Sequence, residues 1–466
     1  MHPVSRFSYD LVVAGLGIAG SMAATAAGRL GLRVLAFDYS AFPGGVLTSS
    51  GTGPMMTFHA GETQVIRGLT GEMVDRMVAK GLSPGHIPDS TGFTYTVTPF
   101  DHEGMKRELE LMLQEAGVRI LYHAMLDGVE VESDRITRIS ALTKSGRIEF
   151  EAPYFIDATG DAELSYKAGV ACEFGRPGDG LAQPMTMKLR LYGVDIAEIR
   201  RFMRANPHEF PMLASRWNIL DEAPRLSCAG FNSILKAAQD AGEISFGRET
   251  ALFFETNTPG EVIVNMSRIL GKKSTDPWSL TEAEMEGRRQ IWELYEFFRK
   301  RVPGFSEARM GFSGPFVGVR RSRQIVGRHR IAVQELFERT RFPDLISHCG
   351  YPVDIHSPDG SGTEHRHFEY GAYYNVPLRA MLPREIGNLV TAGRCISADF
   401  AAQASLRLSP HSGALGHAAG VAAAQALRQG VAVADASHDA IFDTLIAQGA
   451  FLDPENGPAS AAGPSA

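Results

Sequence analysis

The sequence predicts an α/β protein in which a parallel sheet, assembled from distant segments, accompanies a second, mixed α+β domain. Three short apolar strands at residues 11–14, 154–157 and 388–392 carry this prediction, because each runs directly into a turn that contains glycine. The carboxyl ends of parallel strands share one crevice, so we expect the three turns to meet there.

Composition limits the class of protein. The chain has 466 residues, of which 44% are hydrophobic, enough for a large core and two joined domains. Its net charge of −7 offers no attraction to nucleic acid or anionic lipid. The charge-free stretch 11–28 is interrupted by glycines, which argues against a signal peptide or a membrane span. The four cysteines lie far apart, so we expect a cytoplasmic protein without disulfides or zinc.

The first strand begins a complete βαβ unit over residues 9–38. The strand LVVA is followed by GLGIAG, a helix of small residues and the strand RVLAF. In such a unit Gly15 makes the tight turn, Gly17 lets the backbone approach a pyrophosphate, and Gly20 lets the helix meet the strand. Asp38 ends the second strand, where a carboxylate accepts a ribose hydroxyl and disfavours a 2′-phosphate. The unit predicts a dinucleotide site without distinguishing FAD from NAD.

The loop at residues 41–53 extends this predicted site. Gly44 and Gly45 permit close approach of the backbone, and Thr48 offers a small hydroxyl. An ordinary loop remains the alternative interpretation of residues 41–53. Much further along the chain, the strand at residues 154–157 leads into Thr159, which we also expect at the crevice.

The remaining segments define the expected domains. A capped amphipathic helix and a strand are predicted in residues 99–123, and an antiparallel meander in residues 127–156. We place the dinucleotide-binding domain in residues 1–190 and 381–435, the substrate or cap domain in residues 191–380, and a disordered tail in residues 452–466.

The last long helix is predicted from SPHSGALGHAAGVAAAQAL, residues 409–427. Ser409 and Pro410 suit a helix start, the first as a cap and the second at the first helical position. Each glycine inside a helix costs roughly 0.5–1 kcal/mol relative to alanine, so the glycines here indicate a close approach to a neighbour. That neighbour is either a bound ring or simply the packed sheet.

Taken in order, VVAGLGIAG, GGVLTSSG, PFDHEGMK, FIDATGDAEL, GVRRSRQIVGRH, AGRCIS and ALGHAAGVAAA resemble segments of the FAD-dependent oxidoreductase family, two-domain flavoproteins distantly related to the fumarate reductase flavoprotein. The resemblance runs from about residue 8 to 432. It implies a Rossmann-like FAD-binding domain with FAD held non-covalently, and a helix after Pro410 whose N-terminus faces the pyrimidine edge of the flavin ring. There the helix dipole would favour the anionic, reduced ring.

The resemblance also implies positions for the cofactor contacts. A basic residue follows Gly393, where the wider superfamily often carries an acid, which leaves phosphate as the partner that Arg394 suits. The cofactor contacts expected from the motifs and the resemblance together are Gly15, Gly17, Gly20, Asp38, Gly44, Gly45, Thr48, Leu126, Thr159, Gly160, Asp161, Gly393, Arg394, Ser412 and Gly413.

Arginines concentrate in GVRRSRQIVGRHRI, residues 318–331, although the chain is acidic overall. On a helix Arg320 and Arg323 share a face, and on a strand Arg321 and Arg323 do. A guanidinium suits a substrate carboxylate, so we single out Arg320 and Arg323; surface arginines paired with acids are the alternative.

A flavin dehydrogenase needs an acid or base near the carbon that exchanges the hydride. Residues that titrate near neutrality, or a tyrosine with an altered pKa, are the candidates, and the sequence does not rank them. Within residues 348–382, His356, His365 and His367 lack convincing partners for a metal, so we expect none. The candidates are His59, His356, Tyr373 and His411, of which His59 and His411 would also be attachment points if FAD were covalent.

The interpretation that these patterns favour is a flavoenzyme that transfers a hydride between flavin N5 and a small, acidic organic substrate. The partner that exchanges electrons with the flavin and the oligomeric state are left open by the sequence. Three alternatives stay open as well: a flavin-dependent monooxygenase, a redox-neutral isomerase or hydratase that contains FAD, and a nucleotide-binding protein without catalysis.

Overall fold

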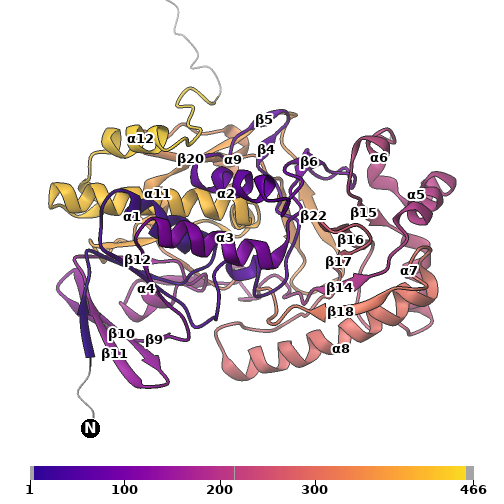
Figure 1. Cartoon of the computed structure of the whole chain (residues 1–466), viewed down its shortest axis with the longest axis horizontal. Coiled ribbons are helices and arrows are strands. Elements are labelled where there is room, and N and C mark those ends of the chain that lie inside the picture. Colours follow the sequence, from indigo (N-terminus) through magenta and orange to yellow (C-terminus); the bar gives the residue numbers. More distant parts are fainter. Residues whose placement is uncertain (1–4, 215, 458–466) are drawn as a thin grey trace, which may run out of the picture.

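The computed structural model describes residues 5–214 and 216–457, and its parallel sheet, marked by β12, lies in the left part of Figure 1. Its strands come from three separate parts of the chain, and the α/β class with a parallel sheet is thereby confirmed. In spatial order they are β24 (Leu389–Thr391), β12 (Tyr154–Asp157), β2 (Leu11–Ala14), β3 (Val34–Phe37) and β8 (Arg119–Leu121).

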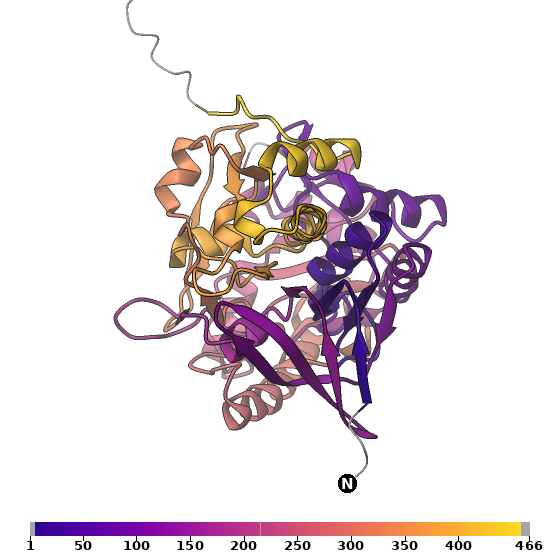
Figure 2. The same ribbon diagram turned by 90° about the vertical axis from the view of Figure 1, so that its left-hand side faces the viewer.

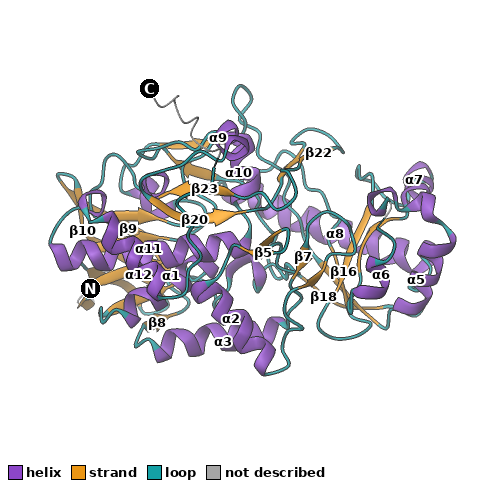
Figure 3. Cartoon of the chain, turned by 90° about the horizontal axis from the view of Figure 1, so that it is seen from above, coloured by secondary structure: helices purple, strands orange, loops and turns teal. Residues whose placement is uncertain are grey.

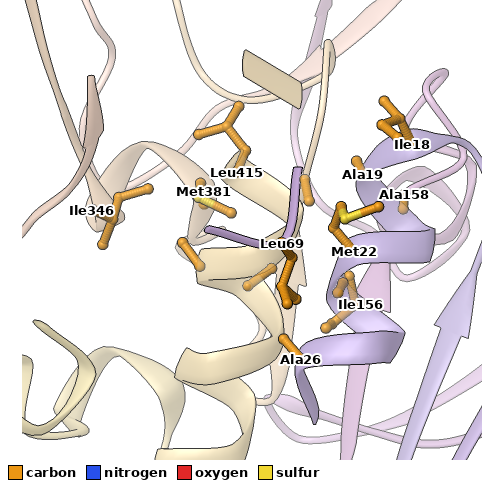
Figure 4. Packing of buried hydrophobic residues seen from close by; sticks show 14 of the residues in the cluster. Ile18, Ala19, Met22, Ala26, Leu69, Ile156, Ala158, Ile346, Met381 and Leu415 are labelled. Carbon is orange, nitrogen blue, oxygen red and sulfur yellow. The ribbon is translucent and has the colours of Figure 1, made fainter. Parts of the chain in front are cut away.

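Helices cover one face of this sheet. Buried residues of α1 pack against α11 and against the sheet, as Figure 4 shows for Ala19, Met22 and Ala26. Figure 2 looks along α11, which lies centrally among the other helices of this layer. The helices are α1 (Ile18–Arg29), α2 (Gly68–Ala79), α3 (His102–Glu115), α11 (Ser409–Gln429) and α12 (His438–Ala447).

The other face of the parallel sheet is covered by the predicted meander. Val12 and Phe37 of the sheet share a buried cluster with Ile139 and Phe150 of the meander, so the unit has three layers. The N-terminal strand joins this sheet in parallel, which the sequence did not indicate. The order is β1 (Ser5–Ser8), β11 (Gly146–Glu151), β10 (Arg135–Thr143) and β9 (Met125–Glu132).

A second hydrophobic core lies in residues 185–317, at the right of Figures 1 and 3. It forms between an antiparallel sheet and four helices, the longest of which ends just before Pro303. The sheet order is β15 (Ser227–Gly230), β16 (Ala251–Glu255), β17 (Val262–Val264), β14 (Leu189–Tyr192) and β18 (Arg309–Ser313), and the helices are α5 (Ile196–Ala205), α6 (Ile219–Glu222), α7 (Asn232–Asp240) and α8 (Pro277–Arg301). The domain boundaries at residues 190, 380 and 435 stay predictions.

Short elements connect these layers. The strand pairs are β4 (His59–Ala60) with β5 (Thr63–Gln64), β6 (Ile87–Pro88) with β7 (Thr96–Val97), β13 (Cys172–Phe174) with β19 (Arg323–Ile325), β20 (Leu345–Cys349) with β23 (Tyr374–Pro377), and β21 (Val353–His356) with β22 (Thr363–Arg366). The short helices are α4 (Glu163–Lys167), α9 (Val333–Glu338) and α10 (Phe400–Leu406). No helix in the described part of the chain is long and apolar enough to cross a bilayer.

The glycines of α11 serve contact with α1. A Cβ at Gly416 would lie 1.9 Å from the carbonyl oxygen of Ala19, and one at Gly420 would lie 2.2 Å from that of Ala23. The second contact lies four residues after the first on both helices, so α1 and α11 run parallel. Both alternatives left open for these glycines, a bound ring and the packed sheet, are wrong for Gly416 and Gly420, which approach the backbone of α1.

Two further expectations need correction. The residue before α11 is Leu408, no side chain caps the helix, and Ser409 is its first residue rather than its cap. The C-terminal segment is ordered further than predicted: the backbone of Asp453 donates to His348 Nε2 at 2.8 Å, and Asn456 donates to the Asn375 side chain at 3.0 Å. Residues 458–466 of the predicted tail lie outside the described residues.

We predict that Gly416→Ala destabilises the protein by about 1–3 kcal/mol, because the added methyl group forces two helix backbones apart. Gly71→Ala is the matched control, since its Cβ meets only the Gln64 side chain at 3.7 Å in a helix interior. The control should be neutral or stabilising by about 0.5–1 kcal/mol. Thermal unfolding followed by circular dichroism measures both, and equal midpoints for the two variants would contradict the proposed close contact.

Candidate functional site

A crevice opens at the carboxyl edge of the parallel sheet, where the three glycine turns meet. Residues from all three distant segments line it together, including Gly15, Thr159 and Gly393. The positions expected from the sequence that line this crevice are Gly15, Gly17, Asp38, Gly44, Gly45, Leu126, Thr159, Gly160, Asp161, Gly393, Arg394 and Ser412.

The other three expected positions, Gly20, Thr48 and Gly413, do not line the crevice. A Cβ at Gly20 would lie 1.9 Å from the carbonyl oxygen of Gly15, so Gly20 allows the strand and helix to meet. Thr48 donates its hydroxyl to the carbonyl of Pro43 at 2.7 Å, inside its own loop. Gly413 faces Thr70 of α2, whose hydroxyl would be 2.5 Å from an added Cβ. These residues shape the backbone around the crevice without lining it.

The start of α1 has the features of an anion site. No side chain caps this helix, so its first N–H groups and the positive end of its dipole face the crevice. Gly17 and Gly45 approach so closely that a Cβ on Gly45 would lie 2.9 Å from the Gly17 Cα atom. A Cβ on Gly17 itself would meet only Gly45, at 3.8 Å, because it points into the open space. The backbone is therefore bare where a pyrophosphate would lie.

Asp38 lies at the end of β3, where it is held by backbone N–H groups. Its two carboxylate oxygens accept hydrogen bonds from Leu16 at 2.6 Å and from Ser40 at 2.8 Å. Burial raises the pKa of Asp38 despite these bonds, which act in the opposite direction. Each oxygen retains a lone pair, so the carboxylate can still accept from a ribose hydroxyl.

Arg394 is already paired with an acid of the crevice. Its guanidinium donates to Asp161 at 2.7 Å and to the hydroxyl of Ser322 at 2.9 Å. The nearby Glu163 carries a pKa raised to about 7 by burial and by the acids Asp161 and Asp157. The pairing with Asp161 neutralises the positive charge that the sequence analysis assigned to a phosphate, although Arg394 still lines the crevice.

A second, inner cavity adjoins the crevice beyond the start of α11. We define the inner cavity by Lys188, Arg248, Arg320, Asp354 and His356, which lie between the antiparallel sheet and β21. Residues shared by the walls of both spaces are Val46, Val319, Arg394, Arg407 and Ser409. A ligand in the inner cavity therefore lies next to whatever fills that end of the crevice.

The inner cavity carries more basic than acidic side chains. Among the described residues Arg407 has a carboxylate partner within 4 Å, Asp354 at 3.2 Å, whereas Arg320, Arg248 and Lys188 have none. Arg320 donates instead to the carbonyl of Pro184 at 2.6 Å.

Burial and mutual repulsion lower the pKa values of these basic side chains. Burial, reinforced by neighbouring arginines, lowers the pKa of Arg320 to about 9 and that of Arg248 to about 10. Burial and Arg320 also hold the pKa of Lys188 well below its usual range. A cavity with uncompensated cations favours an anionic occupant.

Asp354 is the negative centre of the inner cavity. Its carboxylate lies 3.3 Å from Nε2 of His356 and 3.5 Å from Nε2 of His365. Burial would raise the pKa of Asp354, but His356, Arg407 and His365 together hold it below its usual range. Burial lowers the pKa of His356 to about 3, so its imidazole is neutral at pH 7 and oriented by the carboxylate.

The other acid–base candidates lie outside the inner cavity. Tyr373 donates to Asp453 at 2.9 Å, and burial raises its pKa to about 12. His411 is buried in α11, 2.9 Å from the carbonyl of Leu406. His59 lines a separate surface cavity.

The predicted arginine pair is separated as well. Arg320 precedes β19 in an irregular segment, whereas Arg323 begins β19 and lies 4.1 Å from the ring centre of Tyr166, away from both spaces. Neither a helix nor a strand runs through both residues, so the shared face expected for them does not form.

Several residues of the inner cavity escaped the sequence analysis. Lys188, Arg248 and Arg407 lie in three separate segments without a shared motif, and Asp354 is an isolated acid before His356. The sequence signal was weak: Lys188 and Arg190 interrupt the apolar stretch MTMKLRL, and Arg407 interrupts ASLRL. Within the described residues, His, Cys, Asp and Glu side chains form no cluster of three suited to a metal ion.

Comparison with known proteins gives one extensive match. The sequence model of a family described as FAD dependent oxidoreductase matches residues 10–445. No curated protein compared with the chain matches it.

Solved structures show only distant similarity. A geranylgeranyl bacteriochlorophyll reductase-like protein from Thermoplasma acidophilum has 11% identity and a TM-score of 0.48 over 94% of this chain and 83% of its own. The p-nitrophenol 4-monooxygenase of Pseudomonas putida has 12% identity and a TM-score of 0.46 over 96% and 85%. Anhydrotetracycline hydroxylase of Streptomyces rimosus has 13% identity and a TM-score of 0.44 over 95% and 66%. These scores carry no argument about a reaction or a substrate.

We predict that Asp354→Asn lowers the thermal midpoint, because it leaves Arg407 and its neighbours without their carboxylate. Removing one partner of a buried pair costs about 3–5 kcal/mol. Added formate should restore part of the midpoint, since an anion that binds only the folded state stabilises it.

Asp10→Asn is the matched control, because Asp10 pairs with the surface residue Arg33 at 2.8 Å. It should cost at most about 1 kcal/mol and show no rescue by formate. Equal effects of formate on both variants would contradict an anion site in the inner cavity.

Proposed function

This chain belongs to the FAD dependent oxidoreductase family, and from that premise we propose that it transfers a hydride between FAD and a small organic acid held in the inner cavity. The family match confirms the resemblance drawn from the sequence, FAD as the cofactor and an oxidoreductase as the class of enzyme. The substrate and the residues assigned below are our proposal. The observation that carries it is the group of buried, uncompensated cations directly beside the crevice.

The residues of the crevice fit FAD. The bare backbone at Gly17 and Gly45, together with the uncapped start of α1, would hold the pyrophosphate. Asp38 would accept a ribose hydroxyl through its remaining lone pairs. Ser409 and Ser412 line the crevice at the start of α11 and would face the end nearest the inner cavity. When bound there, FAD supplies the exchange of a hydride at N5 of its ring.

The basic side chains of the inner cavity would bind the acid group of the substrate. The Arg320 guanidinium is held by Pro184 and Thr186 and can still offer further N–H donors to a carboxylate. Arg248 adds positive charge without a carboxylate partner of its own within the described residues. Lys188, whose pKa burial and Arg320 hold well below its usual range, would gain a proton more readily beside a bound anion. A substrate carboxylate bound here does not have to displace an internal carboxylate from Arg320 or Arg248, so the cavity favours anionic over neutral substrates.

His356 is the residue that we assign to proton movement. It lines the inner cavity, and Asp354 can orient the ring and stabilise it once it gains a proton. In the unliganded site, burial and the cations Arg320 and Arg407 keep the pKa of His356 low. A bound carboxylate would offset those cations and raise the pKa, so the imidazole becomes a stronger base when the substrate is present.

One experiment separates this proposal from the alternatives. The purified protein should show a visible flavin band, and anaerobic addition of a panel of small hydroxy, amino and saturated acids should bleach it with one of them. Stimulated consumption of NADH together with uptake of oxygen would indicate a monooxygenase instead. Turnover without any change in flavin colour would indicate a redox-neutral enzyme, and tight FAD binding without turnover a binding protein.

We predict that Gly17→Val abolishes retention of FAD while the fold persists. The added side chain enters the open space of the crevice, and the backbone at Gly17 is extended at φ −61° and ψ −179°, which valine tolerates. The ratio of flavin to protein absorbance should fall at least about ten-fold, since occupied space excludes the pyrophosphate.

Gly362→Val is the matched control, because a Cβ there meets only Glu249 at 3.8 Å, away from the crevice. Retention of flavin by Gly17→Val at the level of this control would contradict the assigned pyrophosphate position.

We predict that Arg320→Met lowers kcat/KM for the acidic substrate by about 10- to 100-fold, the loss expected for a hydrogen bond to a charged group. FAD content should not change, because Arg320 does not line the crevice. Arg323→Met removes the same charge outside both spaces and should leave kcat/KM unaltered. Equal kinetics of the two variants would overturn the assignment of Arg320.

A further inference from the structure

The long helix α8 carries an unusual stripe of exposed apolar side chains. Trp278, Met285 and Trp292 are exposed by 78%, 64% and 59%, and they recur at intervals of seven residues. Seven residues are close to two turns of helix, so the three side chains lie along one line. Figure 1 shows α8 along the lower border of the molecule, with no other element beyond it.

The stripe adds little packing within the described residues, where Trp292 meets the ring of Tyr295 edge-on at 5.9 Å between ring centres. The opposite face of α8 fills the second core through Ile291, Leu294 and Phe298, so the helix is already held in place. Single exposed apolar residues are normal on a protein surface, but two tryptophans and a methionine aligned on one helix mark an interaction site. Charged side chains, Glu282 and Arg288 among them, flank the apolar stripe.

The stripe and its flanking charges are self-complementary about Met285. Trp278 and Trp292 lie seven residues on either side of it, and Glu282 and Arg288 lie three residues on either side. If a second α8 crossed this one antiparallel with Met285 on the two-fold axis, Trp278 would meet Trp292 of the second copy, and Glu282 would meet Arg288 of the second copy. A two-fold interface requires this match of a surface with itself.

The charges favour a second copy over a membrane. Glu282 and Arg288 are exposed by 62% and 54%, so both can reach across an interface. Within the chain Glu282 pairs with Lys272 at 2.6 Å, and Arg288 with Glu284 at 3.3 Å, so contacts across the axis would join these into one network. The helix as a whole carries five acidic and five basic residues. Helices that lie on anionic lipid are instead rich in lysine and arginine.

We propose that this protein forms a two-fold symmetric homodimer through antiparallel pairing of α8, with Met285 at the axis. The interface is linked to the crevice, because Leu280 and Glu284 of the same helix line the crevice wall. Glu284 also accepts from the backbone of Val317 at 2.9 Å, which ties that wall to α8. Pairing of α8 would therefore fix one wall of the FAD site in each subunit.

The test is the mass of the FAD-loaded full chain in solution, by light scattering at micromolar concentration. The parent should have twice the 50.5 kDa of one chain. Met285→Glu should give monomers, because it brings two carboxylates together at the axis. Val78→Glu, a change at another exposed apolar side chain on α2, should leave the mass of the dimer unaltered.

Charge exchange tests the register. Glu282→Arg and Arg288→Glu should each raise the dissociation constant about ten-fold or more, because each places like charges opposite one another. The double variant should restore the parent value. A monomeric parent, including one that binds anionic vesicles, would overturn the proposal. A dimer that survives Met285→Glu, or single effects that the double variant does not reverse, would overturn it equally.

Discussion

The architecture depends on the direct backbone contact between α1 and α11. Gly416 and Gly420 bring α11 against the carbonyl oxygens of Ala19 and Ala23, closer than any side chain would permit. Because the two helices run parallel, their N-termini lie at the same end, which is the crevice. Two sets of free N–H groups and two positive dipole ends therefore point at one ligand, as suits a cofactor with both a pyrophosphate and a ring that becomes anionic. The cost of the glycines is offset by this convergence.

The two connected spaces differ in their balance of charge. In the crevice the one arginine of the glycine turns, Arg394, is neutralised by Asp161, so binding there relies on backbone groups and helix ends. In the inner cavity Arg320 and Lys188 are buried without carboxylate partners among the described residues, at an electrostatic cost that is visible in their lowered pKa values. Such a cost is relieved when an anion binds, so the cavity gains stability from the same contact that would select an acidic substrate.

Sequence patterns predicted the parts of the site that consist of backbone. The turns at Gly15, Gly160 and Gly393 follow from glycine placed directly after buried strands, a local pattern that does not depend on distant parts of the chain. The same patterns failed where a side chain acts through distant neighbours. Arg320 and Arg323 are three positions apart, yet the chain turns between them and only the first lines the inner cavity. The tail after residue 452 was predicted from composition alone, which does not register that Asn456 pairs with Asn375.

The sequence by itself determined the α/β class, the βαβ unit at residues 9–38 and, through the ordered motifs, the family and its cofactor. These depend on the residue types at fixed local spacings, because turn geometry is decided within a few positions of the chain. Only the tertiary structure decided which basic residues surround one cavity, since Lys188, Arg248, Arg320 and Arg407 come from four separate segments. It also decided that the glycines of α11 face another helix, because a missing side chain does not reveal which neighbour occupies its space.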